Sequence, residues 1–370
     1  MSAGDYAYVN AKIGALRSWM LTPGEYRSLC EAASLEECVS LLKATHLGKS
    51  TAKLGEEPEI PQVEALLFSE LASEYGRLVQ GVRKEAKMVL QRLYRKFVAD
   101  TVLKPLLRLK SAGVPQEALQ DLFYPSQPLP KQVLAKLLGA EDVREMVESL
   151  RDTVYYKPLA GALSAYQEAG VAALTTALDG ALYRELWSST GSLSTKDRRI
   201  ARDFIGREVD MRNVLTAFRL RGSEFTKLEQ QLIPVSYRVG RDVLAAILSV
   251  RHLSQLATEI HGFAYHSMVA ALLKEYETIA RELPLGAEFM PASQEAPAQM
   301  EVFSVLPFEL ALRRQMLGAY RGAFRGDRFH IGVPMAHLFL RENEIRNVVT
   351  ILKLKEAGVP AEGIEKALAM

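Results

Sequence analysis

Acidic and amide side chains recur in two segments of this chain at spacings that could hold a metal ion. Glu208, Asp210 and Asn213 lie close together in the first segment. The same residue types return at one constant offset as Glu342, Glu344 and Asn347. Carboxylate and amide oxygens are ligands that hard cations prefer. One hypothesis is therefore a metal-dependent helical enzyme that uses Glu208, Asp210 and Asn213.

The arginines of the two segments suggest other roles for the same carboxylates. Arg212 and Arg346 each lie four residues after a glutamate of the cluster. This is the favourable order for an ion pair on a helix, so these pairs could lie on a solvated surface. A third hypothesis is a structural polar junction, in which Asn213 and Asn347 bond a neighbouring helix end or a crossing chain. Burial would then require partners, because an unpaired buried amide costs about 1–3 kcal/mol.

Further ligands and catalytic motifs are scarce. A di-metal site in a helix bundle uses Glu-x-x-His on facing helices, and that motif is absent. The histidines of His261–His266 and His330–His337 are not spaced as ligands on one helix face, and Cys30 and Cys38 lack a second Cys/His pair at zinc-like spacing. No P-loop, Gly-x-Gly-x-x-Gly or Gly-x-Ser-x-Gly motif occurs. We therefore expect no metal, no cofactor and no catalysis.

Helices must position these side chains, because apolar residues recur at spacings of three and four along most of the chain. A long helix is predicted from Gly76 to Lys110, with an apolar stripe of Leu78, Val82, Ala86, Val89, Leu93 and Phe97. Pro105 should kink or restart it, since proline lacks the N–H donor. Phe329–Val333 is the one short strand candidate, so the predicted fold class is all-α. Loops are expected at 55–61, 124–130, 232–237 and 284–297.

The polar segments belong to an internal repeat. "EVDMRNVLTAFRLRG" at 208–222 matches "ENEIRNVVTILKLKEAGVP" at 342–360, whose end is also matched by "LRLKSAGVP" at 107–115. We call these three segments, together with the helical residues that lead into them, the tails. The first tail is expected to have lost the polar cluster, because the equivalent positions hold Phe97, Ala99 and Val102.

The segments that precede the tails repeat as well, and we call them the heads. "SLEECVSLL" at Ser34, "DVREMVESL" at Asp142 and "HLSQLATEI" at His252 share the apolar frame of one short amphipathic helix. Three helical domains follow, at 1–125, 126–236 and 237–370. Each is larger than a solenoid repeat and large enough to hold its own core.

Charge is distributed along the same division. Heads lean acidic and tails lean basic, although the net charge is only +2. These charges could simply be solvated helix faces, or they could form a surface that docks an acidic protein partner or faces an anionic membrane. Nucleic acid is not an expected partner, because no aromatic-basic recognition motif occurs. No signal peptide or apolar run long enough to span a bilayer is found. Two cysteines favour a reducing compartment.

The order and spacing of these motifs resemble the C subunit of the archaeal and bacterial V/A-type ATPases, which corresponds to the d subunit of the eukaryotic vacuolar enzyme. The stretch "FHIGVPMAHLFLRENEIRNVVTILKLKEAGVPAEGIEKAL" at 329–368 carries most of the likeness. The middle copy "REVDMRNVLTAFRLRG" and the N-terminal "YAYVNAKIGALRSWMLTPGEYRSLCEAASLEECVSLLKAT" are also similar to it. The likeness covers the whole chain, apart from the 284–297 excursion and the altered first tail.

The resemblance implies a fold and a function. It implies three similar helical domains arranged as a funnel with pseudo-threefold symmetry. It also implies a non-catalytic component of the central stalk that couples the rotor shaft to the membrane proteolipid ring, at the cytoplasmic face, for ATP synthesis or ion transport. We expect the tails to line a socket and the heads to lie outside. The candidate interface residues are Glu208, Asp210, Arg212, Asn213, Arg219, Arg221, Glu342, Glu344, Arg346 and Asn347. A generic helical scaffold and the metal-dependent enzyme are the alternatives.

Overall fold

The computed structural model describes residues 4–48, 59–82, 84–123, 129–252, 255–259, 265–267, 269–270, 273 and 304–370. This part of the chain is helical and contains no β-strand, which confirms the all-α fold class for these residues. The strand predicted at Phe329–Val333 is wrong, because that segment is a turn from which a long helix begins at Gly332. None of the helices in the described ranges is long and apolar enough to cross a membrane.

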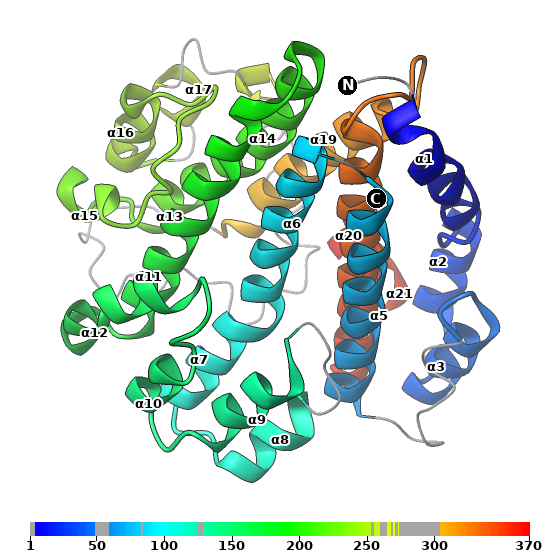
Figure 1. The fold of residues 1–370 in the computed structure, drawn as a ribbon, viewed down its shortest axis with the longest axis horizontal. Helices are drawn as coiled ribbons and strands as arrows, with labels where there is room; N and C mark the ends of the chain where they lie inside the picture. The colour runs from blue at the N-terminus through cyan, green and yellow to red at the C-terminus, as the bar shows by residue number, and fades with distance from the viewer. Residues whose placement is uncertain are drawn as a thin grey trace.

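Groups of short helices separate pairs of long helices along the chain (Figure 1). In chain order they are α1 (Gly4–Arg17), α2 (Pro23–Glu31), α3 (Leu35–Ala44), α5 (Ile60–Gly81), α6 (Lys84–Val98), η1 (Ala99–Leu103), α7 (Lys104–Ser111), α8 (Gln116–Phe123), α9 (Lys131–Gly139), α10 (Val143–Glu148), α11 (Tyr156–Gly161), α12 (Leu163–Ala169), α13 (Val171–Ser189), η2 (Thr190–Ser192), α14 (Thr195–Arg219), α15 (Phe225–Glu229), α16 (Arg241–Ser249), α17 (Leu256–Glu259), α19 (Leu306–Gly322), α20 (Gly332–Glu356) and α21 (Ala361–Ala367).

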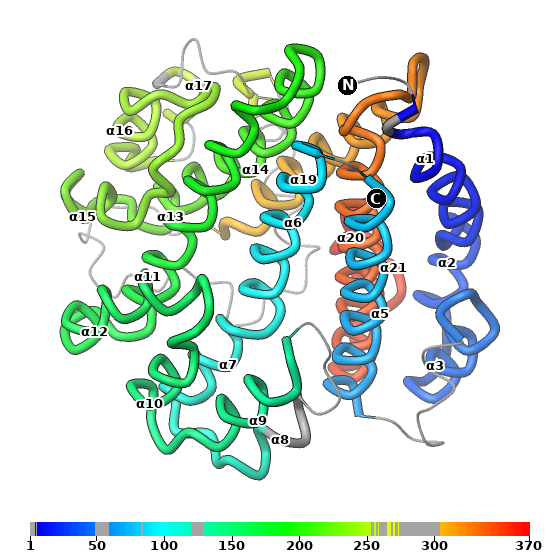
Figure 2. The backbone as a smooth tube through the Cα atoms, in the orientation of Figure 1, coloured from blue at the N-terminus to red at the C-terminus, as the bar shows by residue number. Residues whose placement is uncertain are grey.

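Three hairpins of long helices form the centre of the molecule. They are α5 with α6, α13 with α14, and α19 with α20. The second helix of each hairpin also packs against the first helix of another: α6 against α13, α14 against α19, and α20 against α5. The last pair brings the C-terminal part of the chain back to the N-terminal part (Figure 2). The hairpins therefore close into a ring, and the short helices lie around it (Figure 1).

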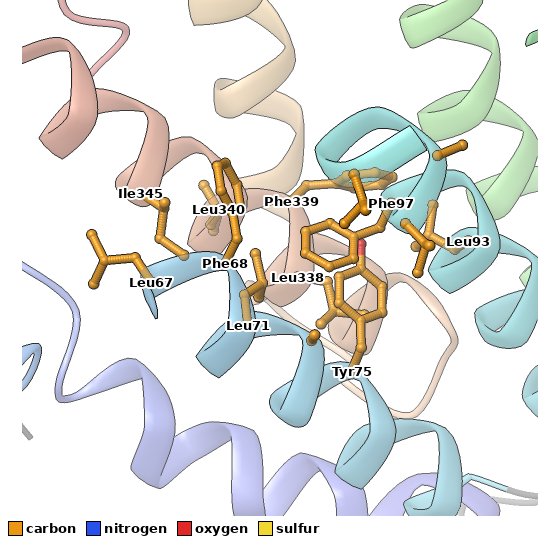
Figure 3. Close-up of a cluster of buried hydrophobic side chains, with 14 of the residues drawn as sticks. Leu67, Phe68, Leu71, Tyr75, Leu93, Phe97, Leu338, Phe339, Leu340 and Ile345 are labelled. Atoms are coloured by element: carbon orange, nitrogen blue, oxygen red, sulfur yellow. The ribbon is translucent and has the colours of Figure 1, made fainter. Parts of the chain in front are cut away.

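The contact between α5 and α20 shows how the ring closes (Figure 3). Leu71 and Tyr75 of α5 are fully buried, as is Leu338 of α20, and Phe97 of α6 stacks on Tyr75 with ring centroids 4.9 Å apart. These positions recur at spacings of three and four, so each helix presents a continuous apolar face. Truncating one such buried leucine to alanine typically costs about 2–5 kcal/mol. Ring closure therefore rests on apolar packing between distant segments.

The tails end as their Gly-containing sequences predict. Gly113, Gly222 and Gly358 follow α7, α14 and α20 with φ of 78°, 80° and 73°. In the last tail the N–H of Val359 donates to the Leu354 carbonyl at 2.9 Å, and Val114 donates to Leu109 at 3.0 Å in the first. A left-handed glycine just beyond a helix allows these bonds to close the last turn.

The head helices are present where the repeat predicts them. Ser34 caps α3 by accepting from the Glu37 N–H at 3.2 Å, and Asp142 caps α10 by accepting from the Glu145 N–H at 2.8 Å. Such caps satisfy N–H groups that lack a partner within the helix. The third head contains the short helix α17.

The predicted helix from Gly76 to Lys110 is not continuous. α5 ends at Gly81 and α6 begins at Lys84, whose φ of 52° turns the chain. A π-helical turn, η1, then interrupts the helix before Pro105, which lies in the first turn of α7, where its missing N–H costs little. The loop at 232–237 is non-helical, as predicted. The loop predicted at 55–61 ends earlier than expected, because Ile60 and Pro61 already belong to α5, whereas residues 129–130 are non-helical as predicted. Residues 55–58, 124–128 and 284–297 lie outside the described residues.

Candidate functional site

A cavity of about 480 Å³ lies between the three hairpins. The tails supply η1, α7, α14 and α20 to its wall, and α13 and α19 complete it. Its charged lining residues are Asp100, Lys104, Arg108, Asp179, Glu208, Arg212, Arg219, Glu309, Arg313, Glu342 and Arg346. Both signs of charge are thus mixed around one concave surface.

Two salt bridges join the first and second tails in the buried part of this cavity. Lys96 of α6 pairs with Glu208 at 2.8 Å, and Asp100 of η1 pairs with Arg212 at 2.9 Å. Lys96 also reaches Asp100 at 3.1 Å, so the four side chains form one network. Lys104 extends the network by bonding Asp100 at 2.6 Å and Asp179 of α13. In the third tail Glu342 and Arg346 pair with each other at 2.8 Å.

The π-helical turn explains how the first tail contributes to this network. A π-helical turn contains one more residue than the α-helical path it replaces. Residues before it therefore shift by one place relative to the other tails, which puts Lys96 level with Glu208 and Asp100 level with Arg212. The expectation that the first tail lost the polar cluster holds for the second acidic position and the amide, where Ala99 and Val102 are apolar, but not for the charged pair. The first tail keeps the pair, one residue earlier and with the two charges exchanged.

Burial and pairing shift the pKa values of this network. Burial disfavours a charged lysine and acts to lower the pKa of Lys96. The negative charges of Glu208, Asp100 and Glu342 outweigh this effect, so the pKa of Lys96 is raised. Burial also opposes ionisation of Asp100, yet Lys104, Arg212 and Lys96 hold its pKa well below the ordinary value. All four groups of the central bridges, Lys96, Asp100, Glu208 and Arg212, are therefore charged at neutral pH.

Exposure along the cavity shows where it opens. On α14, Glu208 is 7% exposed, whereas the Arg219 side chain, three turns later, is 55% exposed and pairs with Glu309 at 3.5 Å. Aromatic rings close the other end: Tyr320 stacks on Phe339 with centroids 4.7 Å apart. The cavity thus has an aromatic floor, a buried charged layer above it, and a mouth near the end of α14.

Asn213 and Asn347 each bond a crossing chain through both ends of the amide. Asn213 Nδ2 donates to the Ile233 carbonyl at 3.1 Å, and its Oδ1 accepts from the Ile233 N–H at 2.9 Å. Asn347 does the same with Ala369, at 2.9 and 3.3 Å. Each amide thus satisfies both the N–H and the carbonyl of one residue in a segment that crosses the helix, as a backbone partner would. This is the geometry that the polar-junction hypothesis expects.

Asp210 and Glu344 lie on another side of their helices, away from the cavity. Asp210 accepts from the backbone N–H of Arg238 at 3.1 Å and from the Tyr265 hydroxyl at 3.0 Å. Glu344 accepts from the backbone N–H of Leu21 at 2.5 Å. Each carboxylate therefore holds the chain that leads into another group of short helices.

Glu344 also belongs to a buried charged cluster between α20, α5 and the end of α3. Arg341 pairs with Glu344 and with Glu74 of α5, at 3.4 Å for the latter, and donates to His46 Nε2 at 2.9 Å. Glu74 in turn bonds His337. Burial and the nearby Arg341 cation lower the pKa of His46 to about 4, so this imidazole is neutral and its Nε2 accepts the hydrogen bond from Arg341.

These contacts argue against the metal hypothesis for Glu208, Asp210 and Asn213. Glu208 binds cations, Asp210 binds backbone N–H groups and Asn213 binds Ile233, so the three side chains point to different partners. Among the residues that the structure describes, no group of three His, Cys, Asp or Glu side chains could hold a metal. Cys30 and Cys38 are buried free thiols whose pKa values are raised by burial.

Comparison with known proteins decides the family of this chain. A family model described as the ATP synthase (C/AC39) subunit matches residues 9–367. The chain belongs to the ATP synthase (C/AC39) subunit family. The C subunit of the A-type ATP synthase of Methanocaldococcus jannaschii is 27% identical to it, over 98% of this chain and 86% of that protein. The C subunit of Halorubrum lacusprofundi is 26% identical, over 98% and 97%. The resemblance drawn from the sequence motifs is therefore confirmed.

The candidate interface residues of this C/AC39 family member fall into two groups. Those that line the cavity are Glu208, Arg212, Asn213, Arg219, Glu342 and Arg346. Those outside it are Asp210, Arg221, Glu344 and Asn347. Arg221 is buried and donates to the Val250 carbonyl at 3.2 Å, so it braces a loop. That any of them contacts another protein of the complex stays a prediction.

Sequence reasoning missed the first tail's share of the charged layer. Lys96, Asp100 and Lys104 were hidden because an alignment without gaps places Phe97 and Thr101 opposite the Glu–Arg pair. A signal was available, because Lys96 and Asp100 are themselves four residues apart and of opposite charge. Asp179 and Arg313 lie outside the tails, on α13 and α19, so the repeat gave no hint of them.

Proposed function

We propose that this chain is a non-catalytic component of the central stalk of a rotary V/A-type ATPase. It couples the rotor shaft to the membrane proteolipid ring and transmits torque for ATP synthesis or ATP-driven ion transport. The observation that carries the proposal is the charged cavity, open at one end and surrounded by three helical hairpins that close into a ring. Family membership supports it, since the relatives are named as C subunits of A-type ATP synthases.

The arrangement suits an adaptor that must transmit torque. Packed helices deform little, because protein interiors are as dense as organic crystals. We propose that the three domains at 1–125, 126–236 and 237–370 form a pseudo-threefold funnel around the cavity. The end of the shaft enters this funnel, while the proteolipid ring holds the chain at the cytoplasmic face of the membrane.

The mouth of the cavity offers a direct test of the socket. Arg108 and Arg219 are exposed there, so Arg108→Glu with Arg219→Glu should disturb a partner in the cavity more than the fold. Lys131→Glu with Lys136→Glu on α9 is the matched control, because both lysines are exposed and outside the cavity. Tagged chains are expressed in cells that assemble the complex, and co-purified proteins are identified after gentle solubilisation.

We expect the unaltered chain and the control to recover the shaft, the ATPase sector and the proteolipid ring. The mouth variant should keep the ring and lose most of the shaft and the ATPase sector. Full recovery of the shaft with the mouth variant would refute the socket. Recovery of neither shaft nor ring with the unaltered chain would refute the rotor role and favour a generic helical scaffold.

A further inference from the structure

The turns of the three long hairpins meet at one end of the molecule, which we call the hairpin end. Lys196 at the start of α14 pairs with Asp327 in the turn before α20. The N–H of Ile331 in that turn donates to Asp197 at 2.8 Å. The second and third turns are thus bonded to each other, toward the upper end of the view in Figure 1.

Helix α1 connects the first turn to this group. Asn10 Nδ2 donates to the Arg328 carbonyl at 2.6 Å. The ring of Tyr8 lies against Gly81, the last residue of α5, since a Cβ there would be 3.5 Å from it. All three turns therefore belong to one face, opposite the mouth of the cavity near the end of α14.

The hairpin end is strongly basic. Its exposed cations are Lys84, Lys87, Lys196, Arg199, Arg325 and Arg328. Few carboxylates offset them: Asp197 is buried, Asp327 is bonded to Lys196, and Glu85 is half-buried. The net +2 charge of the whole chain conceals this local excess.

Large apolar side chains lie among these cations. Phe329 is 48% exposed and Tyr8 is 66% exposed, and they are two of the few large hydrophobic side chains at the surface of the described residues. Exposed aromatic rings beside lysine and arginine are typical of protein surfaces that lie at a membrane interface. An acidic protein surface would be matched by the cations alone and gives no reason for the exposed rings.

We propose that the hairpin end binds anionic phospholipid headgroups, with Tyr8 and Phe329 dipping into the interface. Each lysine or arginine near an anionic bilayer contributes about 1 kcal/mol. This attraction falls off within about 10 Å at ordinary salt. The inference rests on the charges and rings of this chain and does not require the coupling role, so either could fail without the other. Because the two features lie at opposite ends, lipid and an occupant of the cavity can be bound together.

Flotation of the purified full chain with vesicles tests the proposal. Vesicles of phosphatidylcholine alone are compared with vesicles that also contain phosphatidylglycerol, at low and high salt. The variant combines Lys84→Glu, Lys87→Glu, Arg199→Glu and Arg325→Glu. None of these four side chains forms an ion pair within the described ranges, so the fold should persist. The matched control reverses four exposed cations elsewhere, at Lys131, Lys136, Arg144 and Lys157.

We expect the unaltered chain and the control to float with anionic vesicles only, and salt to weaken binding. The hairpin-end variant should bind at least about tenfold more weakly, given the contribution of each cation. Phe329→Ser should weaken the binding that survives at high salt. Equal binding to neutral vesicles, or an equal loss in the control, would overturn the proposal. Binding to polyglutamate but not to anionic vesicles would overturn it in favour of an acidic protein partner.

Discussion

At the scale of single residues, the exchange of charges in the first tail resolves an electrostatic conflict. Three identical tails around one cavity would bring three glutamates to one level and three arginines to the next. Like charges that share a buried site repel each other, which raises the pKa values of carboxylates and lowers those of basic groups, so that the neutral forms are favoured. Lys96 replaces one glutamate and Asp100 replaces one arginine, so each level contains both signs. The Lys96–Asp100 pair of the first tail therefore complements the Glu208–Arg212 pair in charge.

Removing one member of this network should be costly. Lys96→Met leaves the buried Glu208 and Asp100 with Arg212 as their one remaining shared cation, which should lower the free energy of unfolding by about 3–5 kcal/mol. Adding Glu208→Gln removes the repulsion and should restore part of the loss, so the double variant is more stable than the sum of the single changes. Chemical denaturation of the four proteins of this cycle measures the coupling. Lys84→Met, at an exposed site, is the control, and additivity in the cycle would contradict a coupled network.

His46 should make stability depend on pH. Its pKa of about 4 lies below the ordinary value near 6.5, because burial and Arg341 disfavour the imidazolium. Between these values the unfolded chain binds the proton and the folded chain does not, so the free energy of unfolding should fall as pH drops from 6.5 toward 4. His330, whose pKa is also lowered by burial, acts in the same direction.

The variant His46→Gln isolates this contribution, because a glutamine oxygen can still accept from Arg341. Denaturation midpoints measured across this pH range should fall less steeply in the variant than in the unaltered protein. Identical slopes would show that the pKa of His46 does not differ between the folded and the unfolded chain.

At the scale of elements, close packing between α14 and the 232–237 loop sets a strict size limit. A Cβ at Gly206, in the middle of α14, would overlap the ring and the Cβ atom of Tyr237. Gly206→Ala should therefore destabilise the protein by about 1–3 kcal/mol through overpacking, despite the better helix propensity of alanine. Gly180→Ala on α13 meets Pro234 only at ordinary contact distance, 3.5 Å, and should be neutral or stabilising by up to about 1 kcal/mol. Thermal denaturation compares them, and equal effects would contradict the stated packing.

Periodicity and repeats predict which elements exist better than where they break. The heads, the tails and their glycine stops follow from local rules, so Ser34, Asp142 and Gly358 behave as the sequence predicts. The break at Lys84 and the π-helical turn at Ala99–Leu103 do not, because the apolar spacing of three and four continues across both positions. The cavity could not be predicted from the sequence either, since Asp179 and Arg313 line it from segments with no polar motif.

At the scale of the whole molecule, the two ends differ in chemistry. The cavity end mixes charges of both signs on a concave wall, whereas the hairpin end carries an excess of cations beside exposed rings. Such polarity suits a protein that holds unlike neighbours along one axis. It also separates the experiments, because changes at Arg108 and Arg219 leave Lys84 and Arg325 untouched.

The packing of α20 against α5 also bears on how the chain is made. Leu67 and Leu71 of α5 leave the ribosome long before the residues of α20 that cover them. At about 5–20 residues per second, their delay is on the order of ten seconds to a minute. During that time the nascent chain presents an uncovered apolar stripe, which chaperones recognise and other nascent chains can trap. Completion of the fold therefore waits for the last long helix to be translated.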